Sequence, residues 1–251
     1  MPLDVMSPSF TGVSLLLASV LVAYASLGEL LLALRERFRP GVTAYHRRSL
    51  AAQGAVIALV LVTVAAGPGV SLAEVGIAWP RRSRLEFAVL LAAATVALVA
   101  TGMGVWQRRR ASSGRPVPSL FEATPIARGD QGDGRLDRGW ALGAAVTAGI
   151  YYELLYRGLL IAFFIGVAGL AADRAALAAA AVFVLANLHR GRVRVTATAG
   201  LALVSTIAYT ETSSLLIPAA VHATVNVHDV IKLRALAHRM TPPRLRLIVT
   251  R

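Results

Sequence analysis

Three long stretches without a charged residue constrain the fold of this chain more than any other feature of its sequence. Residues 5–28, 49–73 and 87–107 contain no Asp, Glu, Lys or Arg, and each stretch is at least 21 residues long. A helix of about 20 apolar residues is long enough to cross the roughly 30 Å hydrocarbon core of a bilayer. Each stretch therefore predicts one membrane-spanning helix.

The second half of the chain is also apolar, but ionisable residues interrupt it. Glu153, Arg157 and His189 lie within sequence that is otherwise typical of membrane helices. The uncharged segments around these residues predict four further helices, at about residues 139–166, 172–189, 195–210 and 213–231. The expected fold is all-α, a polytopic helical membrane bundle of about seven transmembrane helices.

The composition favours a membrane protein over a soluble one. Hydrophobic residues make up 56% of the chain and charged residues 16%, whereas a soluble domain carries roughly 25% charged residues. The same hydrophobicity excludes a disordered chain. Because the chain has no cysteine, it forms no disulfides and no Cys-ligated zinc site. The first apolar stretch is long and lacks a basic leader, so we expect a transmembrane helix there rather than a cleavable signal peptide.

The basic residues indicate how the chain is oriented. There are 26 Lys and Arg against 13 Asp and Glu, and the net charge of +13 would suggest a nucleic-acid-binding protein if the chain were soluble. However, 21 of the 26 lie in the 35–48, 107–138 and 190–194 loops and in the C-terminal tail, on one side of the predicted bundle. Cytoplasmic loops of membrane proteins are rich in Lys and Arg. We therefore expect an integral protein of a bacterial cell membrane with its N-terminus outside, its C-terminus in the cytoplasm, the lipid bilayer as a partner and no nucleic-acid partner.

Ionisable residues within the predicted spans point to a functional site, because such residues cost several kcal/mol in lipid unless they are paired or hydrated. Glu153 and Arg157 are four residues apart and face the same side of a helix, as do His222 and Asn226. His189 lies at the end of a third helix. Each cluster has a purely structural explanation: a neutralising ion pair, an interfacial histidine, or a hydrogen bond between helices worth about a kcal/mol. Together they predict a convergent polar pocket of the kind that serves catalysis or transport.

These residues resemble the motifs of the CPBP family of intramembrane proteases, the CAAX-protease and bacteriocin-processing group also called Abi. The family pattern is EExxxR, FxxxH and HxxxN on successive membrane helices. Glu153 and Arg157 match the second glutamate and the arginine of the first motif, His189 matches the histidine of the second, and His222 with Asn226 matches the third. The resemblance covers about residues 70–231.

Two positions depart from the family pattern. The phenylalanine of FxxxH is Leu185 here, and the first glutamate of EExxxR is Tyr152. The resemblance implies that this glutamate activates the water, helped by the second-motif histidine, and that the third-motif His and Asn stabilise the oxyanion. A tyrosine, with a pKa near 10, is a poor general base at neutral pH. The water-activating role therefore has no matching residue.

The sequence also predicts how the chain is divided. Residues 1–106 hold the N-terminal transmembrane helices, and residues 107–138 form a cytoplasmic linker rich in Arg, Gly and Pro. Residues 139–231 form a catalytic-type helical bundle, and residues 232–251 form a basic cytoplasmic tail.

Three hypotheses follow for the function. The first is a membrane endopeptidase that cleaves membrane-associated or prenylated-type peptide substrates with an activated water, with Glu153 as the base and His189 holding the water. A divalent metal such as zinc is a possible cofactor in that case, since Glu153, His189 and His222 supply ligands of the type that zinc accepts. The second is a catalytically inactive family member, with Tyr152 in place of the base, that acts as a membrane binding or scaffolding protein. The third is a transporter, which intramembrane Glu, Arg and His would also suit, although the chain has no paired repeat of the kind common in transporters.

Overall fold

The computed structural model describes residues 7–28, 42–67, 69–80, 82–113, 136–190 and 192–240. These residues are helical apart from short turns and an isolated β-bridge between Ser9 and Gly69, which confirms the all-α fold class. The helical elements in chain order are α1 (Gly12–Ala23), η2 (Tyr24–Gly28), α3 (Val42–Ala66), α4 (Arg82–Ser112), α5 (Leu136–Glu153), η3 (Leu154–Leu159), α6 (Leu160–Gly166), α7 (Ala172–Ala186), η4 (Leu188–Arg190), α8 (Arg192–Thr212) and α9 (Leu216–Met240).

Several of these helices have the length and hydropathy of membrane spans. Within the described residues, Arg47–Ala66, Arg84–Arg110 and Gly139–Gly166 are long and apolar enough to cross a bilayer. Gly12–Leu27 and Leu216–Ile231 are shorter apolar helices. These segments correspond to five of the predicted helices, and the total of seven stays a prediction, as does the orientation of the termini.

The parts predicted to be linker and tail are described only at their edges. Helix α4 continues to Ser112 and α9 continues to Met240, so each enters the segment expected to lie outside the bundle. Residues 114–135 and 241–251 are outside the described residues, and so are residues 35–41 of the 35–48 loop.

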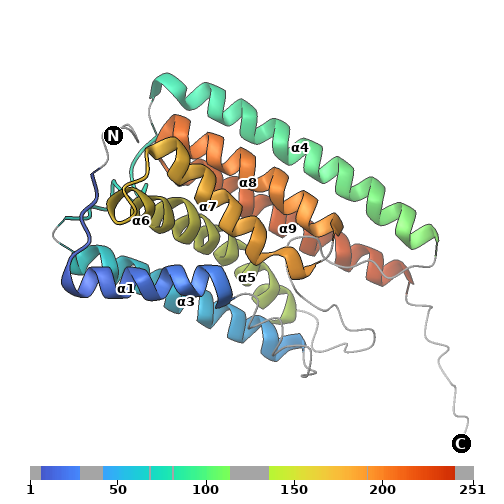
Figure 1. Cartoon of the computed structure of the whole chain (residues 1–251). Helices are drawn as coiled ribbons and strands as arrows, with labels where there is room; N and C mark the ends of the chain where they lie inside the picture. The colour runs from blue at the N-terminus through green and yellow to red at the C-terminus, as the bar shows by residue number, and fades with distance from the viewer. Residues whose placement is uncertain are drawn as a thin grey trace, which may run out of the picture.

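The helices are arranged so that α5 and α9 lie at the centre. Figure 1 shows α4 (green) along one side of the bundle and α1 and α3 (blue) along the other, with α5, α7, α8 and α9 between them. Helix α5 contacts α3 and α9, and α9 also contacts α4 and α8. In an apolar 18-residue stretch of the span Gly139–Gly166, 78% is buried within the protein, against 17% in Arg47–Ala66 and 19% in Arg84–Arg110. The outer helices therefore present their apolar surface to the bilayer. Helix α5, with η3 and α6 that continue it, forms the interior of the bundle.

Two helical turns in the bundle are wider than an α-turn. Segments η2 and η3 are π-helical, so the predicted helix 139–166 is continuous but passes through α5, η3 and α6. Gly158 lies in η3, where a Cβ atom would approach Val75 O to 2.7 Å. The missing side chain thus lets the turn at residues 72–76 pack directly on η3. Single π-helical turns within helices occur frequently at functional sites.

The connection between α3 and α4 is fixed against the turn between α8 and α9. The amide of Leu215 donates to Gly76 O at 2.9 Å, and Ser214 Oγ donates to Ala78 O at 2.6 Å. Gly76 has a φ of +77°, and a Cβ there would lie 2.5 Å from a ring carbon of Tyr209. Only glycine combines this left-handed conformation with such close packing. The connection holds the start of α4 beside the start of α9.

A hydrogen bond joins the two π-helical turns. Tyr156 Oη donates to Ala25 O at 2.7 Å, and the tyrosine side chain is fully buried. We expect Tyr156→Phe to lower the free energy of unfolding by about 1–3 kcal/mol, because the carbonyl of Ala25 loses its buried partner. Chemical unfolding in detergent measures the change. Ser26→Ala is the control, because Ser26 Oγ bonds Val22 O at an exposed position in η2. Equal losses in the free energy of unfolding for the two substitutions would show that the hydrogen bond from Tyr156 to Ala25 O does not stabilise the fold.

Candidate active site

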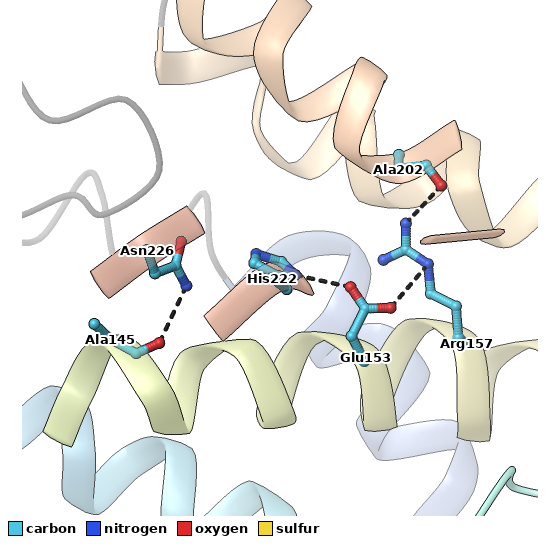
Figure 2. Close-up of polar contacts among 6 residues, drawn as sticks. All are labelled: Ala145, Glu153, Arg157, Ala202, His222 and Asn226. Carbon is cyan, nitrogen blue, oxygen red and sulfur yellow. Dashed lines mark hydrogen bonds and ion pairs between the residues drawn. The ribbon is translucent and has the colours of Figure 1, made fainter. Parts of the chain in front are cut away.

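A buried carboxylate forms the centre of the candidate site. Glu153, the last residue of α5, is completely buried, and its two oxygens have different basic partners. Oε2 lies 3.4 Å from Arg157 Nε, and Oε1 lies 2.8 Å from His222 Nδ1 (Figure 2). An ionised group away from water is tolerated only where it is paired and hydrogen-bonded. These two contacts therefore supply the pairing that a carboxylate at this depth requires.

Arg157 connects the carboxylate to two further helices. Its side chain is 1% exposed, and Nη2 donates to Ala202 O of α8 at 3.0 Å. Its guanidinium carbon lies 4.8 Å from the centre of the Phe183 ring of α7, a cation–π distance. The arginine thus links η3 with α7 and α8 while it neutralises Glu153.

The imidazole of His222 is enclosed by aromatic rings. The ring of Tyr152 stacks on it at 5.4 Å between centroids and 9° between planes. Phe183 meets it edge-on at 6.0 Å and 70°. Because one ring covers a face of the imidazole and another contacts it edge-on, the imidazole plane is fixed and Nδ1 is directed at Glu153.

Asn226 lies one helical turn beyond His222 and also faces α5. Its Nδ2 donates to Ala145 O at 3.2 Å, and the residue is 2% exposed. Figure 2 shows both side chains of α9 along the same side of α5. Between these contacts the helices touch, because a Cβ atom on Gly149 would lie 2.5 Å from Ala223 N. Gly149 therefore sets the distance at which His222 reaches the carboxylate.

Helix α9 has a second, apolar side that faces away from this site. With α4 it borders a cavity of about 1110 Å³, to which it contributes Leu216, Ile217, Ala220, Val221 and Thr224. The polar site and this cavity thus lie on different faces of α9.

Of the six predicted site residues, Tyr152, Glu153, Arg157, His222 and Asn226 are buried in this interior, but His189 is not. His189 lies in η4 after the end of α7, and its side chain is exposed. The helix phase explains the difference. Leu185, four residues earlier, is 61% exposed, so the face that leads to His189 points outward.

The residues that the sequence analysis missed lie on the other face of α7. Phe183 is buried and touches Tyr152, Arg157 and His222. Asn187, four residues after it, is 1% exposed and donates from Nδ2 to Phe183 O at 2.7 Å. Phe183 and Asn187 have the spacing of the FxxxH motif with Asn in the histidine position. The aromatic residue two positions before Leu185 was the signal that would have revealed them.

The predicted metal ligands do not assemble. Within the described residues there is no group of three His, Asp or Glu side chains placed to hold a metal ion. Glu153 and His222 contact each other through Oε1 and Nδ1, Arg157 faces the second oxygen, and His189 is exposed. These donors do not fit a zinc site, which requires at least three protein ligands around one point.

The comparisons with known proteins agree with the resemblance. Residues 136–228 match a family model described as "Rce1-like: Type II CAAX prenyl endopeptidase Rce1-like". No curated protein and no solved structure matches the chain. The matched segment runs from α5 into α9 and contains every residue of the buried site. The family and the apolar helices together indicate an integral membrane protein. Residues 136–228 are thus similar to the type II CAAX prenyl endopeptidase family, and this match supports the resemblance to the CPBP, or CAAX-protease, family.

Proposed function

We propose that this protein is a membrane endopeptidase that hydrolyses peptide bonds of membrane-associated substrates. The observation that carries the proposal is the 2.8 Å contact between Glu153 and His222, buried inside the segment that matches the family model. Hydrolysis of an amide needs a group that takes a proton from water and returns one to the leaving nitrogen. A carboxylate paired with an imidazole is suited to that task. The printed description of the family supports prenylated peptides as the first substrate class to test.

A specific observation favours a second candidate, a family member without catalysis. Tyr152 occupies the position of the first motif glutamate, and it packs on His222 as an aromatic wall. His189 is exposed, and Asn187 occupies the buried position on α7. A protein that lacks both water-activating groups of its relatives would bind membrane peptides or partner proteins without cleaving them.

Cleavage of a reporter peptide tests the first candidate. We expect the full-length protein in lipid vesicles to cleave a quenched fluorescent peptide that carries a C-terminal prenyl-cysteine motif. We expect His222→Ala and Glu153→Gln to lower the rate by about 10²-fold or more, the range of general acid–base catalysis. Arg84→Ala serves as the control, since Arg84 is exposed and pairs with Glu211 near the start of α4. Full activity in both site variants would remove the basis for the proposal.

The substitution Tyr152→Glu distinguishes the two candidates. It restores the motif glutamate beside His222, where the tyrosine ring now stacks. If wild type is inactive and only Tyr152→Glu cleaves the reporter, the native protein is the non-catalytic family member. If wild type already cleaves it, the second candidate is wrong.

A further inference from the structure

We propose that His222 is the group that accepts the proton from water, through Nε2, and that Glu153 is the positioning residue that orients it. This inference rests on the proposed endopeptidase function and assigns its proton transfer. The family position for the water-activating glutamate holds Tyr152, and His189 is exposed. Glu153 and His222 form a buried acid–base pair in the described interior, next to Tyr152.

The hydrogen bond between the two side chains determines which nitrogen carries the proton. Arg157 is charged at every physiological pH and faces Oε2, so it keeps Glu153 ionised. An ionised carboxylate only accepts hydrogen bonds. Its 2.8 Å contact with His222 therefore requires a hydrogen on Nδ1. In a neutral imidazole the other nitrogen, Nε2, then has the free lone pair.

The surroundings of the imidazole ring leave Nε2 able to accept a proton from water. Tyr152 stacks on one face and Phe183 contacts the ring edge-on, so the imidazole cannot turn about its bond without losing both contacts. Within the described residues His222 makes one hydrogen bond, which is through Nδ1. About 3% of the side chain remains accessible. Nε2 makes no hydrogen bond within the described residues, and it is not fully buried. The unbonded nitrogen is thus held in one direction and reachable.

The reaction balances with water as the only co-reactant. The oxygen of water bonds to the carbonyl carbon of the peptide, its proton passes to His222 Nε2, and the carbonyl π electrons move onto oxygen. The imidazolium that forms is stabilised by the Glu153 carboxylate at Nδ1. The oxyanion then re-forms the carbonyl, the C–N bond breaks, and the Nε2 proton passes to the leaving nitrogen. The products are a carboxylic acid and an amine, and His222 is neutral again. A carboxylate that holds a histidine in this tautomer is the general arrangement of hydrolytic triads.

The effect of Glu153 on His222 can be measured without any substrate. In the full-length protein labelled with ¹⁵N-histidine, we expect the His222 signals to show a protonated Nδ1 and an unprotonated Nε2. Glu153→Asp keeps the charge that pairs with Arg157 but shortens the side chain, so we expect a mixture of tautomers. A wild-type ring with its proton on Nε2 would overturn the inference whatever the activity.

Kinetics on the reporter peptide test the catalytic role. We expect His222→Gln, which still hydrogen-bonds Glu153, to lower kcat by about 10²- to 10⁴-fold with little change in KM. We expect Glu153→Asp to lower kcat by a smaller factor. Thr224→Val is the matched control, because Thr224 lies on the opposite, exposed side of α9.

The possible outcomes separate the two proposals. If wild type cleaves and His222→Gln cleaves equally well, the proposed function stands and the role of His222 is wrong. If wild type cleaves no reporter under any condition, the proposed function fails and the catalytic role fails with it. In that case the tautomer measurement still shows whether Glu153 orients the ring.

Discussion

Gly149→Ala is expected to remove most of the peptidase activity, although Gly149 has no side chain that could take part in catalysis. A Cβ atom at this position would lie 2.5 Å from Ala223 N, 2.7 Å from Ala223 Cα and 2.8 Å from Ala223 Cβ. All three atoms belong to or adjoin the α9 backbone, so α9 must move away from α5. That movement takes His222, which precedes Ala223, away from Glu153. A misplacement of about 1 Å costs roughly 10²-fold in rate, and overpacking of this kind destabilises by about 1–3 kcal/mol.

Reporter cleavage and chemical unfolding measure both effects. Gly143→Ala is the matched control on α5, since a Cβ there would lie 3.9 Å from a Leu50 methyl, an ordinary contact. We expect this control to keep its activity and to be at least as stable as wild type, because alanine favours a helix over glycine. Wild-type activity in Gly149→Ala would show that the approach of α9 to α5 does not position the site.

Arg157→Met is expected to be the most destabilising single substitution in the site, at about 3–5 kcal/mol. It leaves the Glu153 carboxylate in the interior without its arginine partner, while the contact with His222 remains. It also removes the donor to Ala202 O and the cation over the Phe183 ring. Chemical unfolding in detergent measures the loss.

A double substitution separates the lost charge pairing from lost packing. With Glu153→Gln added to Arg157→Met, neither position of the pair carries a charge, so we expect the double variant to be more stable than Arg157→Met alone. The exposed pair of Arg84 and Glu211, at 3.6 Å with 62% and 36% exposure, is the comparison. Its removal is expected to cost about 0–1 kcal/mol. Equal losses of stability at the buried and the exposed pair would contradict the conclusion that the buried Glu153 carboxylate depends on Arg157.

The local features of this protein were predictable from the sequence because they depend on spacing within one helix. The uncharged stretches predicted apolar helices, and the spacing of Glu153 and Arg157 predicted an ion pair, which the structure contains at 3.4 Å. The spacing of His222 and Asn226 predicted that both lie on one face of a helix, and in the structure that face of α9 is turned toward α5. Each of these inferences requires only the helical period.

The remaining features depend on how the helices pack. The position of His189 depends on which face of α7 is buried, and both Phe183 and Leu185 are apolar residues that could have faced inward. Only contacts with Tyr152, Arg157 and His222 select Phe183. Likewise, no pattern in the sequence predicted the π-helical turn at η3. This turn contains Gly158, where the chain packs closely against Val75.

The turn at η3 has a consequence for how the chain tolerates change during evolution. A π-turn holds one residue more than an α-turn, and one residue corresponds to about 100° of rotation around a helix. Loss of a single residue between Leu154 and Leu159 would restore a regular helix but rotate all that follows relative to Glu153. Substitutions at exposed positions nearby leave that alignment intact. We therefore expect relatives with the same site to keep the length of this turn.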